Sequence, residues 1–143
     1  MKGQSLIVQF LLFFMIGLGL FGAIGGIFRL QSDIIREDIA KANRNLINSY
    51  VSSIMVSMAN SCKECDFINY SIRLKNVTAN YLMVLNLSKK GLQVSSEPGG
   101  GINSTSIHNL NYTLELGGNA SSSHTIILRF NSTSKRFDLI LKN

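Results

Sequence analysis

The chain has 143 residues, of which 45% are hydrophobic, and a formal net charge of +6. An apolar run near the N-terminal end inflates the hydrophobic content, and the remainder is long enough for one modest folded domain. The lysines and arginines are scattered and form no dense block interleaved with aromatic residues, so binding to nucleic acid is not expected.

An uncharged run of 26 residues extends from Gly3 to Phe28, directly after Lys2. As a helix this run would be roughly 39 Å long, which exceeds the approximately 30 Å hydrocarbon core of a bilayer. A secretory signal peptide has a shorter apolar core and ends at a small-residue cleavage site, and no clear site of that kind follows here. We therefore expect residues 4–28 to form a retained transmembrane or assembly helix.

Two glycines in this run, Gly22 and Gly26, form a GxxxG pair. Such a pair lets two helix backbones approach closely inside lipid, where dispersion contacts drive association. Glycine is also simply common in membrane helices. The pair predicts a helix-packing site, with ordinary membrane-helix composition as the alternative.

Apolar residues continue after Phe28 at intervals of mostly three or four, as in an amphipathic helix. This stripe consists of Leu30, Ile34, Ile35, Ile39, Ala42, Leu46, Tyr50, Ile54 and Met58. The opposite face is predicted to carry charged residues, among them Glu37, Lys41 and Arg44. We expect a helical extension over residues 29–61, whose stripe is covered by the chain's own C-terminal domain or by neighbouring copies.

From Asp66 onward apolar and polar residues alternate, as in half-buried strands. We expect strands over residues 68–75, 81–88, 91–95, 108–116, 125–131 and 137–141, with turns at 89–91, 97–101, 117–119 and 131–136. The expected fold class is α+β, with the long N-terminal helix followed by an antiparallel β-sandwich-like domain or curled sheet of about six strands over residues 62–143. One face of this sheet should dock on the amphipathic helix.

The strand-rich region contains seven Asn-x-Ser/Thr motifs, or sequons. Their asparagines are Asn69, Asn76, Asn86, Asn103, Asn111, Asn119 and Asn131. With fourteen asparagines in the chain and a Ser plus Thr content of about 16%, chance gives only about two such motifs. A sequon accepts a glycan only in an exported and exposed segment. The sequons favour export of the β-domain, with passive accumulation in an Asn-, Ser- and Thr-rich domain as the alternative.

The charges that flank the apolar run favour the opposite orientation. Lys2 precedes the run, whereas four cations follow it, and positive flanks favour the cytoplasmic side. Acidic residues are interspersed among these cations, and a dedicated export pathway overrides such a bias. We give the sequons more weight and expect a single-pass protein of the cell membrane with its C-terminal domain outside.

Cys62 and Cys65 are the two cysteines of the sequence, and they lie where the predicted helix gives way to strands. On the exported side we expect a local disulfide, with free thiols as the alternative. A metal site would need two further ligands, and His108 and His124 show no ligand spacing. A thioredoxin-type redox motif would need a βαβ context, which the predicted elements do not provide.

The sequence lacks the patterns expected of an enzyme. The eight acidic residues are dispersed, the histidines accompany no distinctive nucleophile motif, and the glycines at 99–101 lack the lysine of a phosphate-binding loop. We expect no enzymatic activity, cofactor or metal.

The segment Met1-Lys2-Gly3-Gln4-Ser5 precedes the uncharged helix, its amphipathic continuation and a sequon-rich β-domain. This layout resembles archaeal type IV pilin-like proteins with a class III signal peptide. The resemblance implies that a membrane leader peptidase removes residues 1–3 by cutting between Gly3 and Gln4. It also implies that the exposed helix packs with other subunits in the core of an extracellular filament, which the β-domain coats.

The chain departs from this family at Val8, where pilin-like proteins often place a glutamate, and Gln9 lies beside it. A buried carboxylate there would pair with a neighbouring subunit's amino terminus and set the register of assembly. The layout is also similar to archaellum stator-type subunits, which remain single-pass anchors whose β-sandwich contacts the surface layer.

Two functions are therefore expected as alternatives. One is a pilin-like subunit or accessory protein of an archaeal surface filament, and the other is a membrane-anchored envelope-binding module. The expected partners are the membrane, further copies or related subunits through the N-terminal helix, a surface-layer or filament protein, and the leader peptidase.

Overall fold

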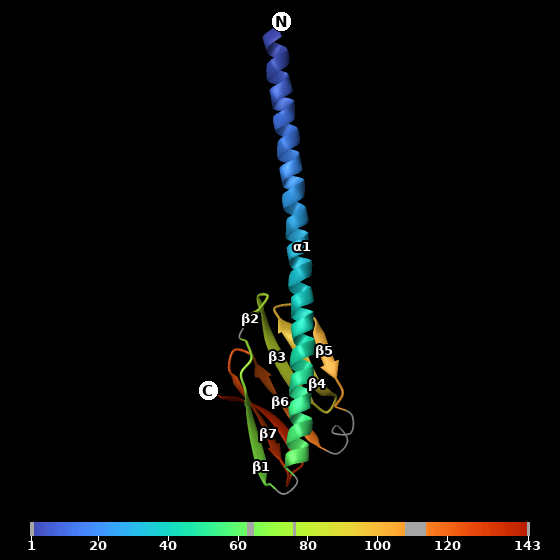
Figure 1. The fold of residues 1–143 in the computed structure, drawn as a ribbon, viewed down its shortest axis with the longest axis vertical. Coiled ribbons are helices and arrows are strands. Elements are labelled where there is room, and N and C mark those ends of the chain that lie inside the picture. The colour runs from blue at the N-terminus through green and yellow to red at the C-terminus, as the bar shows by residue number, and fades with distance from the viewer. Residues whose placement is uncertain (1, 63–64, 76, 108–113, 143) are drawn as a thin grey trace. The chain divides into compact units, whose positions relative to one another are not determined.

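The computed structural model describes residues 2–62, 65–75, 77–107 and 114–142, with only the backbone described for residues 2–5. It has the predicted α+β fold, with one helix followed by a β-sheet (Figure 1). The chain divides into two units, residues 1–36 and 37–143, and each is described by itself.

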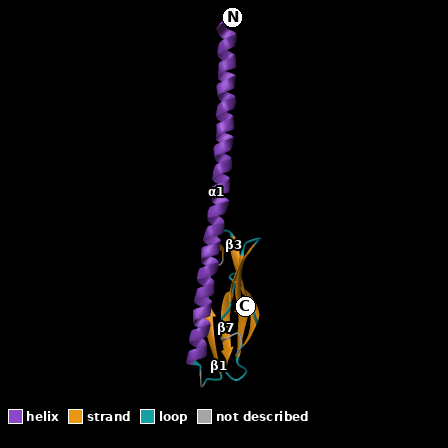
Figure 2. Cartoon of the chain, turned by 90° about the vertical axis from the view of Figure 1, so that its right-hand side faces the viewer, coloured by secondary structure: helices purple, strands orange, loops and turns teal. Residues whose placement is uncertain are grey.

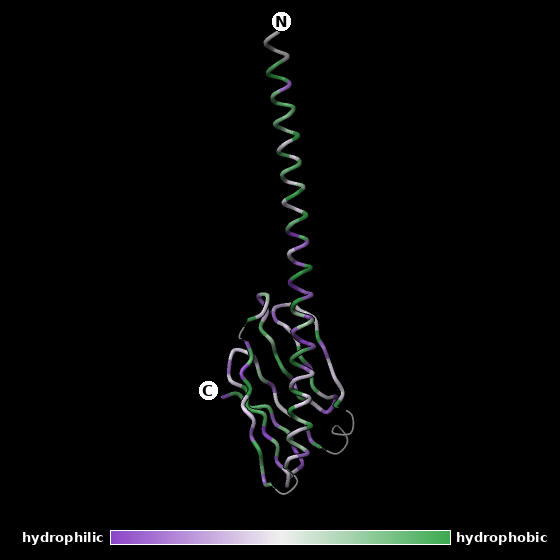
Figure 3. The backbone as a smooth tube through the Cα atoms, in the orientation of Figure 1, coloured by the Kyte–Doolittle hydropathy of each residue, from purple (hydrophilic) through white to green (hydrophobic). Residues whose placement is uncertain are grey.

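Helix α1 runs from Lys2 to Ser61, and its residues before Glu37 form the first unit. Figure 3 colours most of this segment as hydrophobic. Every large hydrophobic side chain from Leu6 to Phe28 is at least half exposed, with exposed fractions between 50% and 82%. Within the described residues, α1 is the one helix long and apolar enough to cross a membrane.

The second unit contains the remainder of α1 and eight strands. The strands are β1 (Phe67–Ile72), β2 (Val77–Thr78), β3 (Tyr81–Ser88), β4 (Gly91–Glu97), β5 (Ile102–Thr105), β6 (Glu115–Ser121), β7 (Thr125–Asn131) and β8 (Arg136–Lys142). All eight belong to one sheet, in which seven follow the order β1-β7-β8-β6-β3-β4-β5 and β2 pairs with β3. The described pairs are antiparallel except β6 with β8, which run parallel.

Several predicted strands agree with the structure, but the count and arrangement differ. The bounds of β3 and β7 are those predicted, whereas β2 and β5 were not predicted. The strands form one sheet with residues 37–61 of α1 on one face, as in the curled sheet that was expected as the alternative to a sandwich (Figure 2). The predicted strand over residues 108–116 lies mostly outside the described residues.

The predicted turn at residues 117–119 is wrong, because these residues lie inside β6. Gly118 has a φ of +118°, and a Cβ built there would lie 2.5 Å from the backbone oxygen of Leu139. Strand β6 pairs with β8 through Gly118 and with β3 from Asn119 onward. Glycine therefore allows β6 to pass from one neighbour to the other, where a side chain would collide with β8.

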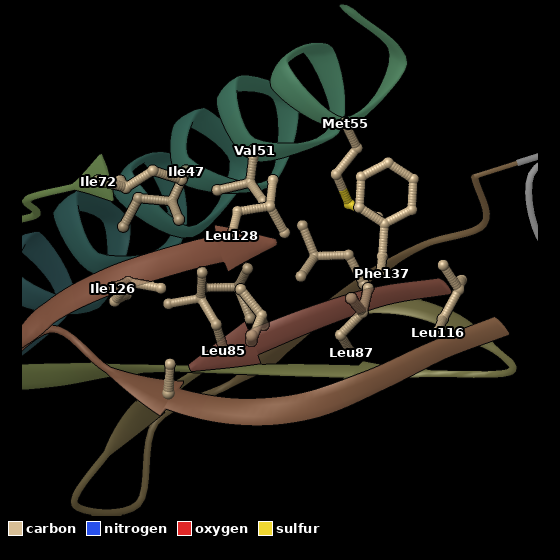
Figure 4. Close-up of a cluster of buried hydrophobic side chains, with 14 of the residues drawn as sticks. Ile47, Val51, Met55, Ile72, Leu85, Leu87, Leu116, Ile126, Leu128 and Phe137 are labelled. Atoms are coloured by element: carbon tan, nitrogen blue, oxygen red, sulfur yellow. The ribbon is translucent and has the colours of Figure 1, made fainter. Parts of the chain in front are cut away.

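The core lies between one face of the sheet and the part of α1 that belongs to the second unit. Ile47, Val51 and Met55 point from the helix toward side chains of the strands, and Met55 points toward Phe137 (Figure 4). Val51, Met55 and Phe137 are fully buried. Burial of each such side chain contributes about 1.5–3 kcal/mol, so this layer holds the helix segment on the sheet.

The helix face that meets the sheet is not the one predicted from the apolar stripe. The buried helical residues are Ala40, Arg44, Ile47, Asn48, Val51, Met55 and Met58. Of the predicted stripe, Ile39, Leu46 and Tyr50 are 47%, 68% and 47% exposed, whereas Met58 is buried. The prediction failed because the buried face includes two polar residues that find partners on the sheet.

Candidate assembly and glycan-acceptor sites

The buried polar residue Arg44 ties α1 to strand β4. Its guanidinium donates a hydrogen bond to the hydroxyl of Ser96, and its Nη2 lies 2.8 Å from Oε1 of Glu37. A Cβ on Gly101 would lie 2.8 Å from the same Nη2. The glycine therefore leaves room for the guanidinium, and the ion pair offsets part of the cost of burying it.

The same contacts act on the carboxyl group of Glu37. The hydrogen bond from Arg44 lowers the pKa of Glu37 below its usual value, and the backbone of Gly101 and the side chain of Tyr81 add to this effect while desolvation opposes it. Sequence patterns placed Glu37 and Arg44 on a solvent-facing stripe. No local signal revealed the burial of Arg44, because Ser96 lies 52 residues further along the chain.

The sequon at Asn103 faces the helix. The side-chain amide of Asn103 donates a hydrogen bond to Oδ1 of Asn45, and Nδ2 of Asn48 donates to Oγ1 of Thr105 at 2.7 Å. The amide and the hydroxyl of this sequon are therefore both engaged by α1. In the folded domain Asn103 therefore serves as a structural contact between β5 and the helix.

Other sequons present their asparagines on the opposite face of the sheet. Asn69, Asn86 and Asn119 are exposed, whereas Ile72, Leu87 and Ala120, which point to the other face of the same strands, are buried in the core. Asn69 accepts a hydrogen bond from Nε of Arg129 at 3.0 Å. We name the surface formed by these three asparagines the acceptor face.

Three further sequons complete the predicted set. Asn131 is half-buried at the end of β7, where its Oδ1 accepts a hydrogen bond from the backbone of Ser134 at 3.0 Å. Asn76 and Asn111 lie outside the described residues.

The two cysteines lie directly after α1. Cys62 and Cys65 are joined by a disulfide, with their Cα atoms 5.0 Å apart. The backbone N–H of Cys62 donates to the carbonyl oxygen of Met58 at 3.0 Å, so the disulfide continues from the last helical turn. Across the described part of the chain, no group of three or more His, Cys, Asp or Glu side chains is arranged to hold a metal ion.

The exposed half of α1 in the second unit forms a candidate contact surface with β1. We name Ile39, Leu46 and Tyr50 the free stripe. Beside it lies a hollow of about 400 Å³ lined mainly by Tyr50, Ile54, Met58, Ile68 and Tyr70. A hydrogen bond with the side chain of Tyr70 raises the pKa of Tyr50 above its ordinary value.

The predicted packing and cleavage residues lie in the first unit. A Cβ on Gly22 or Gly26 would meet nothing within 4 Å, so both glycines present open backbone to the surroundings. Gly3 and Gln4 belong to the first turn of α1.

Comparison with protein-family models, with curated proteins and with solved structures gave no match for this chain.

Proposed function

We propose that this chain is a pilin-like subunit, or an accessory protein, of an archaeal surface filament. In this proposal α1 resides first in the membrane and then packs against the same helix of other subunits. The sheet domain lies outside the cell and carries glycans. The chain acts as a structural protein, and no chemical reaction is assigned to it.

The observation that carries the proposal is the exposure of apolar surface along α1. Residues 6–28 expose every large hydrophobic side chain, which lipid or other helices must cover in the cell. The free stripe extends the exposed apolar surface past the charged residues Arg29, Asp33 and Arg36. Lipid would be sufficient to cover the uncharged run, whereas the free stripe calls for a protein partner.

The acceptor face supports an exported domain. Three sequon asparagines are exposed on a sheet face that the helix does not cover, and glycans on that face would not disturb the core. A disulfide at Cys62 and Cys65 also suits an oxidising location.

The experiment is the intact mass of the full chain, purified from membranes of an archaeal host that contains the leader peptidase. We expect the mature chain to begin at Gln4, having lost Met1, Lys2 and Gly3. Gly3→Leu should block this cut, whereas Gly19→Leu, a matched change in the same helix, should not. A wild-type chain that keeps Met1 would refute the processed-pilin proposal.

The second candidate is a single-pass, membrane-anchored module that binds an envelope protein, similar to archaellum stator subunits. Val8 favours it, because no carboxylate is present there to pair with a neighbouring amino terminus. Such a module would keep residues 1–3 and remain in the membrane fraction, so the same mass measurement separates the two candidates.

A further inference from the structure

Strand geometry decides which parts of a sequon are accessible. In a strand, alternate side chains point to opposite faces, so the Asn and the hydroxyl residue of a sequon share one face. In β3, Leu87 is buried, so Asn86 and Ser88 point to the acceptor face. In β6, Ala120 is buried in the same way.

Asn119 and Ser121 therefore point to that face as well. The two sequons differ in this respect from the one at Asn103, where Asn103 and Thr105 face the helix.

Asn86 and Asn119 are direct partners in the pairing of β3 with β6. The Cα atoms of such antiparallel partners lie about 5 Å apart, with both side chains on one face. Both asparagines are exposed. The two acceptor amides therefore lie side by side on the same face of the sheet.

We propose that Asn86 and Asn119 form one shared glycan-acceptor position, at which each molecule carries a glycan on one asparagine or the other. This inference rests on the proposed export of the sheet domain. Neighbouring strands are about 5 Å apart, and a pyranose ring with its hydroxyl groups is at least as wide. A glycan on one asparagine therefore covers the amide of the opposite asparagine. The covered amide can then no longer bind in the active site of the transferase.

The reaction is ordinary N-glycosylation by an oligosaccharyltransferase, with a lipid-phosphate-linked oligosaccharide as donor. The amide nitrogen of asparagine forms a bond to the anomeric carbon, and the bond from that carbon to the phosphate oxygen breaks. The lipid phosphate leaves with the electron pair, and the amide nitrogen loses one proton to a base of the transferase. The asparagine needs the hydroxyl group two residues further on for recognition.

The test isolates the pair in the full chain, produced in a glycosylating archaeal host. The other five sequons are removed by Asn→Gln at positions 69, 76, 103, 111 and 131. The intact mass should then show the chain with no glycan or with one, and no species with two. Ser121→Ala should place all remaining glycan on Asn86, and Ser88→Ala should place it all on Asn119.

A matched control restores Asn69 in the background that carries Ser121→Ala. Asn69 and Asn86 are four strand spacings apart in the sheet, about 19 Å. This variant should yield molecules with two glycans, which shows that the host can modify the face twice.

A second measurement keeps the test valid if the variant with the five Asn→Gln substitutions does not fold. In the otherwise unchanged chain, Ser121→Ala should raise the glycan occupancy of Asn86, measured by fragmentation of glycopeptides. Unchanged occupancy, or a two-glycan species of the isolated pair, would overturn the shared position.

Failure of the inference and failure of the proposed function give different results. Glycans on Asn69 with none on either Asn86 or Asn119 overturn the shared position alone. A chain without any glycan overturns the glycosylated, exported domain as well.

Discussion

At the scale of single residues, Arg44 sets the position of the helix on the sheet. A buried guanidinium is tolerated when its charge and its donors are matched. Arg44 has Ser96 and Glu37 as partners and the space left by Gly101, all within the second unit. The apolar contacts hold the helix on the sheet, and this polar cluster joins the helical turn at Arg44 to β4.

Replacement of Arg44 by alanine should destabilise the sheet domain. The change removes a buried side chain and leaves the buried hydroxyl of Ser96 without its donor, so the free energy of unfolding should fall by about 2–4 kcal/mol. Urea unfolding of the full chain in detergent, followed by tyrosine fluorescence, measures this loss.

Arg36→Ala is the matched control on the same helix. Arg36 pairs with Asp33 at 3.8 Å, and both side chains are more than half exposed. Its loss should change the free energy of unfolding by less than about 0.5 kcal/mol. Equal effects of the two alanine variants would mean that the Arg44 cluster does not hold the helix.

At the scale of elements, the second half of α1 has two apolar faces with different partners. One face, with Ile47, Val51 and Met55, is buried by the sheet. The other is the free stripe, which the second unit leaves exposed. Because both faces are apolar at helical spacing, the hydrophobic period of the sequence does not separate them.

Aspartate substitutions distinguish the two faces. Leu46 is 68% exposed, so Leu46→Asp should leave the folded domain intact but disperse assemblies that pack through the free stripe. Val51 is fully buried, so Val51→Asp should unfold the domain by placing an unpaired charge in the core. Near-UV circular dichroism reports the fold, and sedimentation reports the assembly.

The free stripe would be excluded as a subunit contact if Leu46→Asp folded and also sedimented as the wild-type chain does.

The strands show how far sequence patterns reach. Alternation predicted β3 and β7 to the residue, because each is a long, regular strand with one buried face. Strand β5 was missed because its side chains are mostly polar and its role depends on contacts with Asn45 and Asn48 of the helix. The glycines of β6 indicated a turn, whereas Gly118 is required there because the backbone of β8 lies too close for a side chain.

In the candidate sites, too, local features could be predicted from the sequence and features that depend on long-range contacts could not. Every sequon was found from the sequence, since the motif is local. Its accessibility depends on the face of the sheet, which follows from long-range pairing. Asn103 and Asn119 carry the same motif, yet one faces the helix and the other faces away from it.

At the scale of the whole molecule, the chain exposes apolar surface on its helix and polar acceptor groups on its sheet. The uncharged run and the free stripe are suited to contacts with lipid or with further copies. The acceptor face is suited to solvent and glycans.

The most direct test of assembly is electron cryomicroscopy of filaments sheared from cells that produce the chain. The proposal predicts a helical reconstruction with copies of α1 packed in the centre and the acceptor face of the sheet at the outer surface. A chain found wholly in the membrane fraction as a monomer, with no filament that contains it, would contradict the proposal.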